Sequence, residues 1–291
     1  MLIFALQITK SKNSKIRKSN NQIKKYLNSQ IYRPLQPAIH PERDEASYRE
    51  CLPSLPLAPY IYCYWQLTSH PSLSQPFVYR VVADGCIDLF FHTCQPQDVY
   101  VMGFSTTYTE FPLDNPFNYI GIRFMPAAFP LLFGVSAAAL TNRFEHLGDV
   151  VPALAAGLTQ QAAGLHSLQE LQPLLNHYFE KILANHTVDA DNRLVQALDL
   201  ILRTGGNIRL ETELHSGVSP RHLRRLFDFY IGESPKTFSK VVRFQQLLHN
   251  TPTADSLRAN KMFYDTGYYD QAHFIKEFKT MYGLPPTVAL R

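Results

Sequence analysis

The sequence predicts an α+β protein in which a β-rich N-terminal domain with packed helices is followed by an all-α domain. Two observations lead to this fold class. Residues 55–124 hold short aromatic and β-branched runs that alternate with Pro, Gly, Asn and Asp, which is typical of a compact antiparallel sheet or barrel. Near the C-terminal end, one helical segment occurs twice at an offset of 51 residues, so this part is expected to consist of two similar helical units.

Composition and periodicity divide the chain of 291 residues into four regions. Residues 1–41 hold eight Lys and Arg, no Asp or Glu and no sustained apolar period, so we expect a flexible basic arm. Residues 42–150 are expected to form the β-rich domain. Ala- and Leu-rich segments predict helices on or beside its sheet, with a helical connector over residues 151–188. Residues 189–291 are expected to form the all-α domain.

The cysteines and histidines are not arranged as a metal site. The four cysteines (Cys51, Cys63, Cys86 and Cys94) show no CxxC or CxxH spacing, and the eleven histidines form no HxH or HExxH motif. We therefore expect reduced, buried thiols in a cytoplasmic protein, with no metal ion and no cofactor. The sequence has no nucleophile elbow and no dinucleotide fingerprint, so we expect no catalytic residue and no enzyme activity. The sequence has no run of eighteen apolar residues, so we expect no membrane-spanning helix.

The repeated segment predicts one capped helix in each copy. Residues 219–235 align with residues 270–286, and the alignment pairs His222 with His273, Phe227 with Phe278, Gly232 with Gly283 and Pro235 with Pro286. Ser219 and Asp270 are good N-caps, because their side-chain oxygens can accept hydrogen bonds from the free N–H groups of the first turn. The two glycines follow the last turn, where a left-handed terminating residue is needed.

Apolar and basic side chains fall on opposite faces of these helices. The first copy places Leu223 and Phe227 on one face and Arg224 and Arg225 on the other. A helix, a Gly-containing turn and a second capped helix with a basic outer face describe a helix-turn-helix, whose second helix fits the DNA major groove. A single copy could equally be a surface helix with solvated arginines, but two matched copies favour two helix-turn-helix units that bind double-stranded DNA.

The residues expected to contact DNA lie near the N-terminal ends of the two repeated helices. They are Ser219, Arg221, His222, Arg224, Arg225, Gln271, Ala272, His273 and Lys276. The segment between the units, residues 235–250, predicts one amphipathic helix that packs against both. Its apolar face would fix their separation through Phe238, Val241, Val242, Leu247 and Leu248. Two units joined in this way could enter major-groove segments about 34 Å apart on one face of the duplex.

Residues 190–291 resemble the DNA-binding domain of the AraC-type family of bacterial regulators. The motifs that carry the resemblance are VSPRHLRRLF, IGESPKTFSKVVRFQ and GYYDQAHFIKEFKTMYGLPP. Residues 55–150 resemble more loosely the N-terminal module of one subgroup of that family, through YIYCYWQL, ADGCIDLFFH and GIRFMPAAF. The resemblance implies a sequence-specific transcription regulator that responds to a small molecule or a partner through its N-terminal domain and is often a homodimer.

The sequence departs from the family where the first helix of each unit usually carries a Leu-Ala pair. The corresponding positions hold Thr212-Glu213 and Met262-Phe263. Because Glu does not easily occupy a packed Ala position, we expect the first helix to be shifted so that Ile208, Leu210 and Leu214 face inward. The family's final aromatic residue is also replaced, near Ala289-Leu290.

A β-rich module in this position could enclose a ligand pocket. Candidates to line it are Tyr62, Tyr64, Trp65, Tyr79, Asp88, His92 and Arg123, although aromatic residues at strand spacing are more often core, and Asp88 and Arg123 could form a buried pair. Two other functions stay open: a small-molecule-binding or enzymatic β-barrel with a degenerate helix-turn-helix end, favoured by Glu213 and Phe263, and a purely structural interaction protein.

Overall fold

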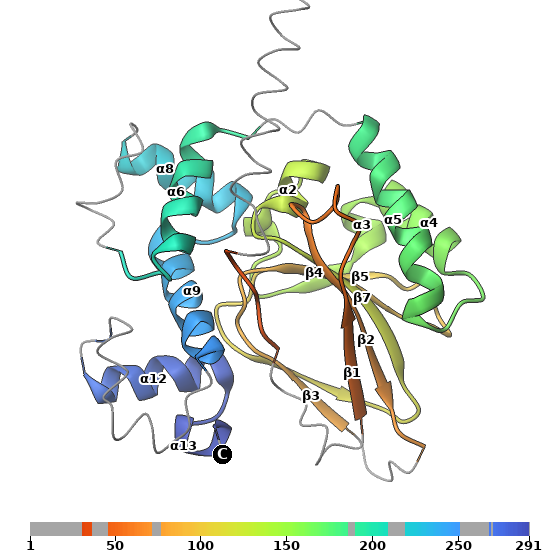
Figure 1. Cartoon of the computed structure of the whole chain (residues 1–291), viewed down its shortest axis with the longest axis horizontal. Coiled ribbons are helices and arrows are strands. Elements are labelled where there is room, and N and C mark those ends of the chain that lie inside the picture. Colours follow the sequence, from red (N-terminus) through yellow and green to blue (C-terminus); the bar gives the residue numbers. More distant parts are fainter. Residues whose placement is uncertain are drawn as a thin grey trace, which may run out of the picture.

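The structure, a computed structural model, describes residues 31–36, 46–71, 77–185, 190–208, 219–250, 268 and 270–290. Figure 1 shows a sheet domain at the right of the view and a group of helices at the left. The order of elements confirms the predicted α+β class, with a β-rich N-terminal part and a helical C-terminal part.

Two antiparallel sheets form the N-terminal domain. The larger has the order β1-β2-β7-β4-β5-β8, and its strands are β1 (Ala46–Cys51), β2 (Ile61–Ser69), β7 (Asn118–Phe124), β4 (Ile87–His92), β5 (Tyr100–Met102) and β8 (Phe144–His146). The smaller sheet pairs β3 (Phe77–Val81) with β6 (Thr109–Leu113). Side chains of β4 alternate between buried and half-buried, as a period of two requires. In this register Asp88 of β4 lies opposite Arg123 of β7.

Helices cover the face of the large sheet that is turned away from the small sheet. They are α2 (Ala128–Phe133), the 3-10 turn η1 (Ala137–Ala139), α3 (Leu147–Val150), α4 (Pro152–Ala162) and α5 (Leu168–Asn185). The ring of Phe179 in α5 lies 5.9 Å from that of Phe124 in β7, and Asn176 Oδ1 accepts a hydrogen bond from Tyr64 Oη at 3.0 Å. The predicted connector therefore includes a helix that packs directly on the sheet.

The C-terminal part consists of α6 (Asn192–Arg203), α8 (Pro220–Tyr230), α9 (Pro235–His249), α12 (Gln271–Tyr282) and α13 (Pro286–Ala289). Figure 1 shows α9 running from α8 at one end to α12 at the other. This is the arrangement that the sequence predicts for residues 235–250 as the segment that joins the two units.

One hydrophobic core extends from the sheet domain into the helical end. The ring of Phe104, in the loop after β5, lies 6.4 Å from the ring of Phe238 in α9. Gln245 of α9 is 1% exposed and donates a hydrogen bond from Nε2 to the carbonyl oxygen of Ala83 at 2.8 Å. The two parts of the described chain are therefore packed together and not joined only through a linker.

Residues 31–36 differ from the flexible arm to which the sequence assigns them. Tyr32 is 4% exposed and donates a hydrogen bond from Oη to the carbonyl oxygen of Asp84 at 2.5 Å. The backbone N–H of Leu35 donates to Gln245 Oε1 at 2.7 Å, and Gln36 Oε1 accepts from the N–H of Val82 at 2.9 Å. A buried aromatic ring and these amide contacts hold the segment against both parts of the chain. Residues 1–30 and 37–41 of the predicted arm lie outside the described residues.

The prediction of buried thiols holds for two of the four cysteines. All four are free; Cys63 and Cys86 are buried, Cys51 is half-buried and Cys94 is exposed. Cys94 follows β4 in a turn at the surface, which explains its exposure.

Candidate functional site

The two copies of the repeat adopt the same local structure. Ser219 Oγ accepts a hydrogen bond from the backbone N–H of His222 at 3.3 Å, and Asp270 Oδ1 accepts from that of His273 at 2.7 Å. At the other end, Gly232 and Gly283 have φ angles of 94° and 92°. Only glycine adopts this region without strain, so both helices end as the sequence predicts.

The next helix also starts in the same way in both copies. Pro235 is the first residue of α9 and Pro286 is the first residue of α13, each just after the terminating glycine and its loop. Proline suits the first position of a helix because a backbone N–H there would have no partner within the helix, so its absence costs no hydrogen bond. The two sequence copies, offset by 51 residues, are therefore also a structural repeat: each consists of one capped helix and the start of the next helix.

Helix α8 places its three predicted arginines in solvent. Leu223 and Phe227 are buried, whereas Arg221, Arg224 and Arg225 are exposed. The half-buried ring of His222 accepts a hydrogen bond at Nδ1 from Arg225 Nη2 at 3.2 Å, and its Nε2 lies 3.9 Å from Asp191 Oδ2. The basic face of α8 is thus open to a partner, while His222 also contacts the N-terminal cap of α6.

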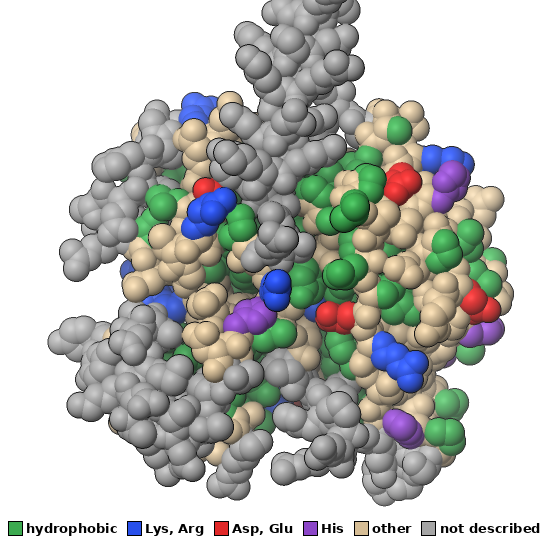
Figure 2. Space-filling view, viewed as in Figure 1, with side chains coloured by type: hydrophobic (Ala, Val, Ile, Leu, Met, Phe, Trp, Pro, Cys, Tyr) green, Lys and Arg blue, Asp and Glu red, His purple; other side chains and the backbone are tan. Residues whose placement is uncertain are grey.

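Helix α12 presents a similar but less basic face. Gln271, Ala272 and Lys276 are exposed, as the sequence predicts for DNA contacts. His273 is half-buried, with its ring 5.7 Å from the ring of Tyr268 and its Nε2 3.8 Å from Glu277 Oε2. On the face drawn in Figure 2, the Lys and Arg side chains of the described residues are scattered singly over the helical end, and these residues form no continuous basic patch there.

Helix α9 holds the two units through buried aromatic pairs. The ring of Phe238 lies 6.2 Å from Phe227 of α8, and the ring of Phe244 lies 5.6 Å from Phe278 of α12. Lys240 adds an ion pair to Glu277 of α12. Val241, Val242, Leu247 and Leu248 are buried as predicted.

Phe244 is the contact that the sequence prediction omits. Its spacing from Val241 and Leu248 is helical and could have identified it.

The predicted shift of the first helices can be examined at one position. Ile208 is half-buried and packs against the hydrophobic core. The other positions of this prediction lie outside the described residues: Leu210, Thr212, Glu213, Leu214, Met262 and Phe263.

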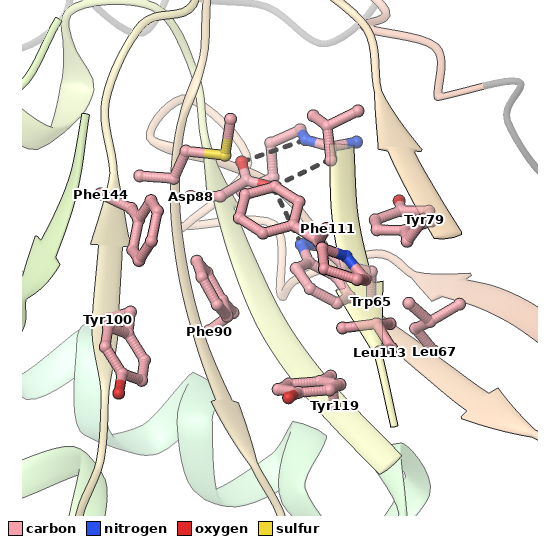
Figure 3. A pocket seen from close by; sticks show the side chains of 14 residues that line it. Trp65, Leu67, Tyr79, Asp88, Phe90, Tyr100, Phe111, Leu113, Tyr119 and Phe144 are labelled. Atoms are coloured by element: carbon pink, nitrogen blue, oxygen red, sulfur yellow. Dashed lines mark hydrogen bonds and ion pairs between the residues drawn. The ribbon is translucent and has the colours of Figure 1, made fainter. Parts of the chain in front are cut away.

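A cavity of about 240 Å³ lies between the two sheets of the N-terminal domain. Figure 3 shows aromatic side chains converging on it, with Phe90 between Trp65 and Tyr100. Its walls come from β2, β4, β5, β7 and β8 of the large sheet and from β3 and β6 of the small one. The lining residues are Trp65, Leu67, Tyr79, Val81, Asp88, Phe90, Tyr100, Met102, Phe111, Pro112, Leu113, Tyr119, Arg123 and Phe144.

Arg123 and Asp88 form a buried ion pair at one end of this cavity. Arg123 Nη2 lies 2.9 Å from Asp88 Oδ2, and the Arg123 side chain is 1% exposed. Arg123 Nε also lies 3.3 Å from Asp84 Oδ2, and Nη1 lies 3.5 Å from Glu50 Oε1. Trp65 Nε1 donates a hydrogen bond to Asp88 Oδ2 at 3.0 Å. Burial raises the pKa of Asp88 above its usual value, and Arg123 opposes that shift.

Four of the seven residues considered for a pocket line this cavity: Trp65, Tyr79, Asp88 and Arg123. The other three have different roles. Tyr64 is buried and donates a hydrogen bond to Asn176 of α5, and Tyr62 is half-buried and packs against the core. His92 Nδ1 lies 3.2 Å from the backbone nitrogen of Cys94 and Nε2 lies 3.2 Å from that of Asn118, and the neutral ring can accept a hydrogen bond from one of the two N–H groups.

The described residues contain no group of three His, Cys, Asp or Glu side chains placed to hold a metal ion. In the same part of the chain, no helix is long and apolar enough to cross a bilayer.

Comparison with known families gives two matches along the chain. Residues 215–291 match a family model described as a helix-turn-helix domain. Residues 49–146 match one described as a domain of unknown function (DUF6597). A search of curated proteins gives no match to this sequence.

Solved structures of ToxT from Vibrio cholerae show a distant similarity. One from strain O395 has a TM-score of 0.38 and 11% identity, over 74% of this chain and 96% of that chain. A structure of wild-type ToxT from strain SCE256, with an unsaturated fatty acid bound, has a TM-score of 0.37 and 10% identity, over 73% of this chain and 85% of that chain. Similarity at this level supports no transfer of ligand or activity.

Proposed function

We propose that this chain, which carries an AraC-type helix-turn-helix domain in its C-terminal part, is a sequence-specific, cytoplasmic transcription regulator of double-stranded DNA. One observation supports this proposal more than any other. The same capped helix with an open outer face occurs twice, in α8 and α12, and the buried helix α9 joins the two. Recognition helices held in this way suit neighbouring major-groove segments.

Arginines near the N-terminal end of α8 suit base reading. Arg can form two hydrogen bonds to the O6 and N7 acceptors of guanine. The side chains of Arg221, Arg224 and Arg225 are exposed and can extend into a groove, Arg225 by exchanging its hydrogen bond to His222 for one to a base. In α12, Gln271 offers an amide that pairs well with adenine, while Lys276 can contact guanine or a phosphate. The second unit would therefore contribute fewer charged contacts than the first.

We propose in addition that the cavity between the sheets is an effector site. The small sheet that covers the cavity also contacts the last turn of α12. The N–H of Ala83, just after β3, donates to the carbonyl oxygen of Met281 at 3.1 Å, and the N–H of Tyr108, just before β6, donates to that of Thr280 at 3.2 Å. A ligand that displaced β3 and β6 would therefore displace α12, which supports control of DNA binding from the cavity.

Selection of duplexes from a random pool by the full chain tests the DNA-binding proposal. We expect enrichment of a motif with two parts, separated by about one turn of the duplex. The Arg221→Ala/Arg225→Ala variant should not enrich the part read by α8. If the full chain enriched no sequence, the proposal would be wrong, and a ligand-binding sheet domain with a degenerate helix-turn-helix end would replace it.

A further inference from the structure

The walls of the cavity between the sheets are mainly aromatic. Seven of the described lining residues carry aromatic rings: Trp65, Tyr79, Phe90, Tyr100, Phe111, Tyr119 and Phe144. Phe90 lies at the centre of this group, with ring centroids 6.4 Å from Trp65, 5.6 Å from Tyr100 and 6.2 Å from Phe111. The faces of such rings carry partial negative charge and attract cations.

Negative charge predominates at the inner end of the cavity. Of the described residues that line it, Asp88 and Arg123 are the two that carry a formal charge. The guanidinium of Arg123 is already surrounded by three carboxylates, those of Asp88, Asp84 and Glu50, at distances of 2.9, 3.3 and 3.5 Å. Three carboxylates against one guanidinium leave an excess of negative charge when all are ionised.

An anionic ligand would be disfavoured in this environment. It would meet the negative faces of the rings and would have to compete with the three carboxylates for Arg123. Although Arg123 Nη1 makes no hydrogen bond, Glu50 Oε1 lies 3.5 Å from it and balances its charge. A cation would interact favourably with both the rings and the carboxylates.

We propose that this cavity binds a small organic cation, in which an amine or quaternary ammonium group is attached to an apolar body. The apolar body would contact Leu67, Met102 and the rings, and the charged group would lie toward Asp88. The cavity of about 240 Å³ is slightly smaller than typical ligand pockets, which favours a compact molecule. The proposal names the class of ligand for the effector site. Only the effect of this ligand on DNA binding rests on the proposed function.

Trp65 supplies a direct readout, because it is the one tryptophan of the chain and lines the cavity. We would titrate its fluorescence in the full chain with three probes of the same shape: benzyltrimethylammonium, the neutral neopentylbenzene and the anionic benzylsulfonate. We expect benzyltrimethylammonium to bind about tenfold or more tightly than neopentylbenzene, and benzylsulfonate to bind most weakly. Equal binding of cation and neutral probe, tighter binding of the anion, or no binding of any probe would overturn the inference.

Phe90→Leu gives a variant that keeps an apolar side chain but removes the central ring. It should weaken the binding of benzyltrimethylammonium about tenfold and change that of neopentylbenzene much less. Phe229→Leu is the matched control, because Phe229 is an exposed ring on α8 and should affect neither probe. An equal loss for both probes in Phe90→Leu would show that the ring serves only for packing.

DNA binding by the same preparation separates the two proposals. If the chain selects a DNA sequence but no cation binds, the ligand class is wrong and the regulatory function stands. If benzyltrimethylammonium binds with the expected preference but no DNA sequence is selected, the cavity is assigned correctly and the DNA-binding function is wrong.

Discussion

Arg225 provides the residue-level test of base reading by α8. Its side chain is exposed and contacts His222 of the same helix face. Replacing Arg225 with Ala should reduce binding to the selected duplex by about 1–3 kcal/mol, because a bidentate contact to guanine would be lost. Binding should be measured by fluorescence anisotropy on the selected duplex and on random DNA.

The control for Arg225→Ala is Arg203→Ala. Arg203 is an exposed arginine at the end of α6 that pairs with Asp199 and lies outside the repeated helices. It should have little effect on either duplex. Equal losses on specific and random DNA in Arg225→Ala would identify Arg225 as a phosphate contact only.

Asp88 provides a second test at this scale, through pH. Burial raises the pKa of Asp88 to about 6, while Arg123 of β7 and the N–H of Trp65 of β2 oppose that shift and Asp84 adds to it. The protonated form lacks the charge that attracts a cation, so proton and cation compete. The affinity for benzyltrimethylammonium, whose own charge does not change, should fall as the pH drops through about 6 and level off above it.

Neopentylbenzene serves as the control for this pH profile, since its binding should not follow the charge of Asp88. Asp88→Asn should remove the pH dependence for the cation as well as weakening its binding. The remaining carboxylates of the group are Asp84 and Glu50, and Glu50 faces Arg123 from β1. A flat profile for benzyltrimethylammonium between pH 5 and 8 in the unmodified chain would contradict a role for Asp88.

At the scale of elements, α9 is predicted to set the separation of the recognition helices. Val242 is 2% exposed on the buried face of α9. Val242→Asp should place an unpaired charge in the core and destabilise the packing by roughly 3–5 kcal/mol. Because each unit alone makes few contacts, DNA affinity should fall toward that of a single unit.

Gln246→Asp is the matched control on the same helix, because it adds the same charge at an exposed position. It should leave the free energy of unfolding and the DNA affinity nearly unchanged. Normal DNA affinity in Val242→Asp would show that α9 does not determine how the two units bind.

The elements that could be predicted from the sequence are those defined by local chemistry. Ser219 and Asp270 as N-caps, and Gly232 and Gly283 as terminating residues, depend on neighbouring backbone groups, so spacing alone identifies them. The sequence does not predict the short strand β8, because its three residues are exposed and form a strand only by pairing with β5.

Long-range packing accounts for the other differences. The docking of residues 31–36 depends on Asp84 and Gln245, which lie 52 and 210 residues away from their partners in the chain. The cavity can be anticipated only in part. The sequence offers Trp65, Tyr79, Asp88 and Arg123 as candidates. The rings of Phe90 and Phe144 come together because β4 and β8 belong to one sheet, and Phe111 joins them because the small sheet packs over it. Periodicity gives no information about such pairs.

At the scale of the whole molecule, the shared core predicts that the sheet domain and the helical end unfold together. Phe238 is fully buried and contacts both Phe104 of the sheet domain and Phe227 of α8. Phe238→Ala should reduce the free energy of unfolding by about 3–5 kcal/mol. Trp65 fluorescence, which reports on the sheet domain, and far-ultraviolet circular dichroism, dominated by helices, should give the same midpoint.

Phe229→Ala is the control for this prediction, because Phe229 is 37% exposed and its loss should cost little. Two separate midpoints in the unmodified chain, or a shift of only the helical signal in Phe238→Ala, would show that the two parts are independent.

Footprinting of the selected duplex tests the central claim, that two joined helix-turn-helix units read one DNA site. We predict two protected major-groove segments on one face, about one helical turn or 34 Å apart. Arg221→Ala/Arg225→Ala should weaken protection in one segment, and Gln271→Ala/Lys276→Ala should weaken it in the other. A single protected segment, or loss of the same segment in both variants, would contradict the account.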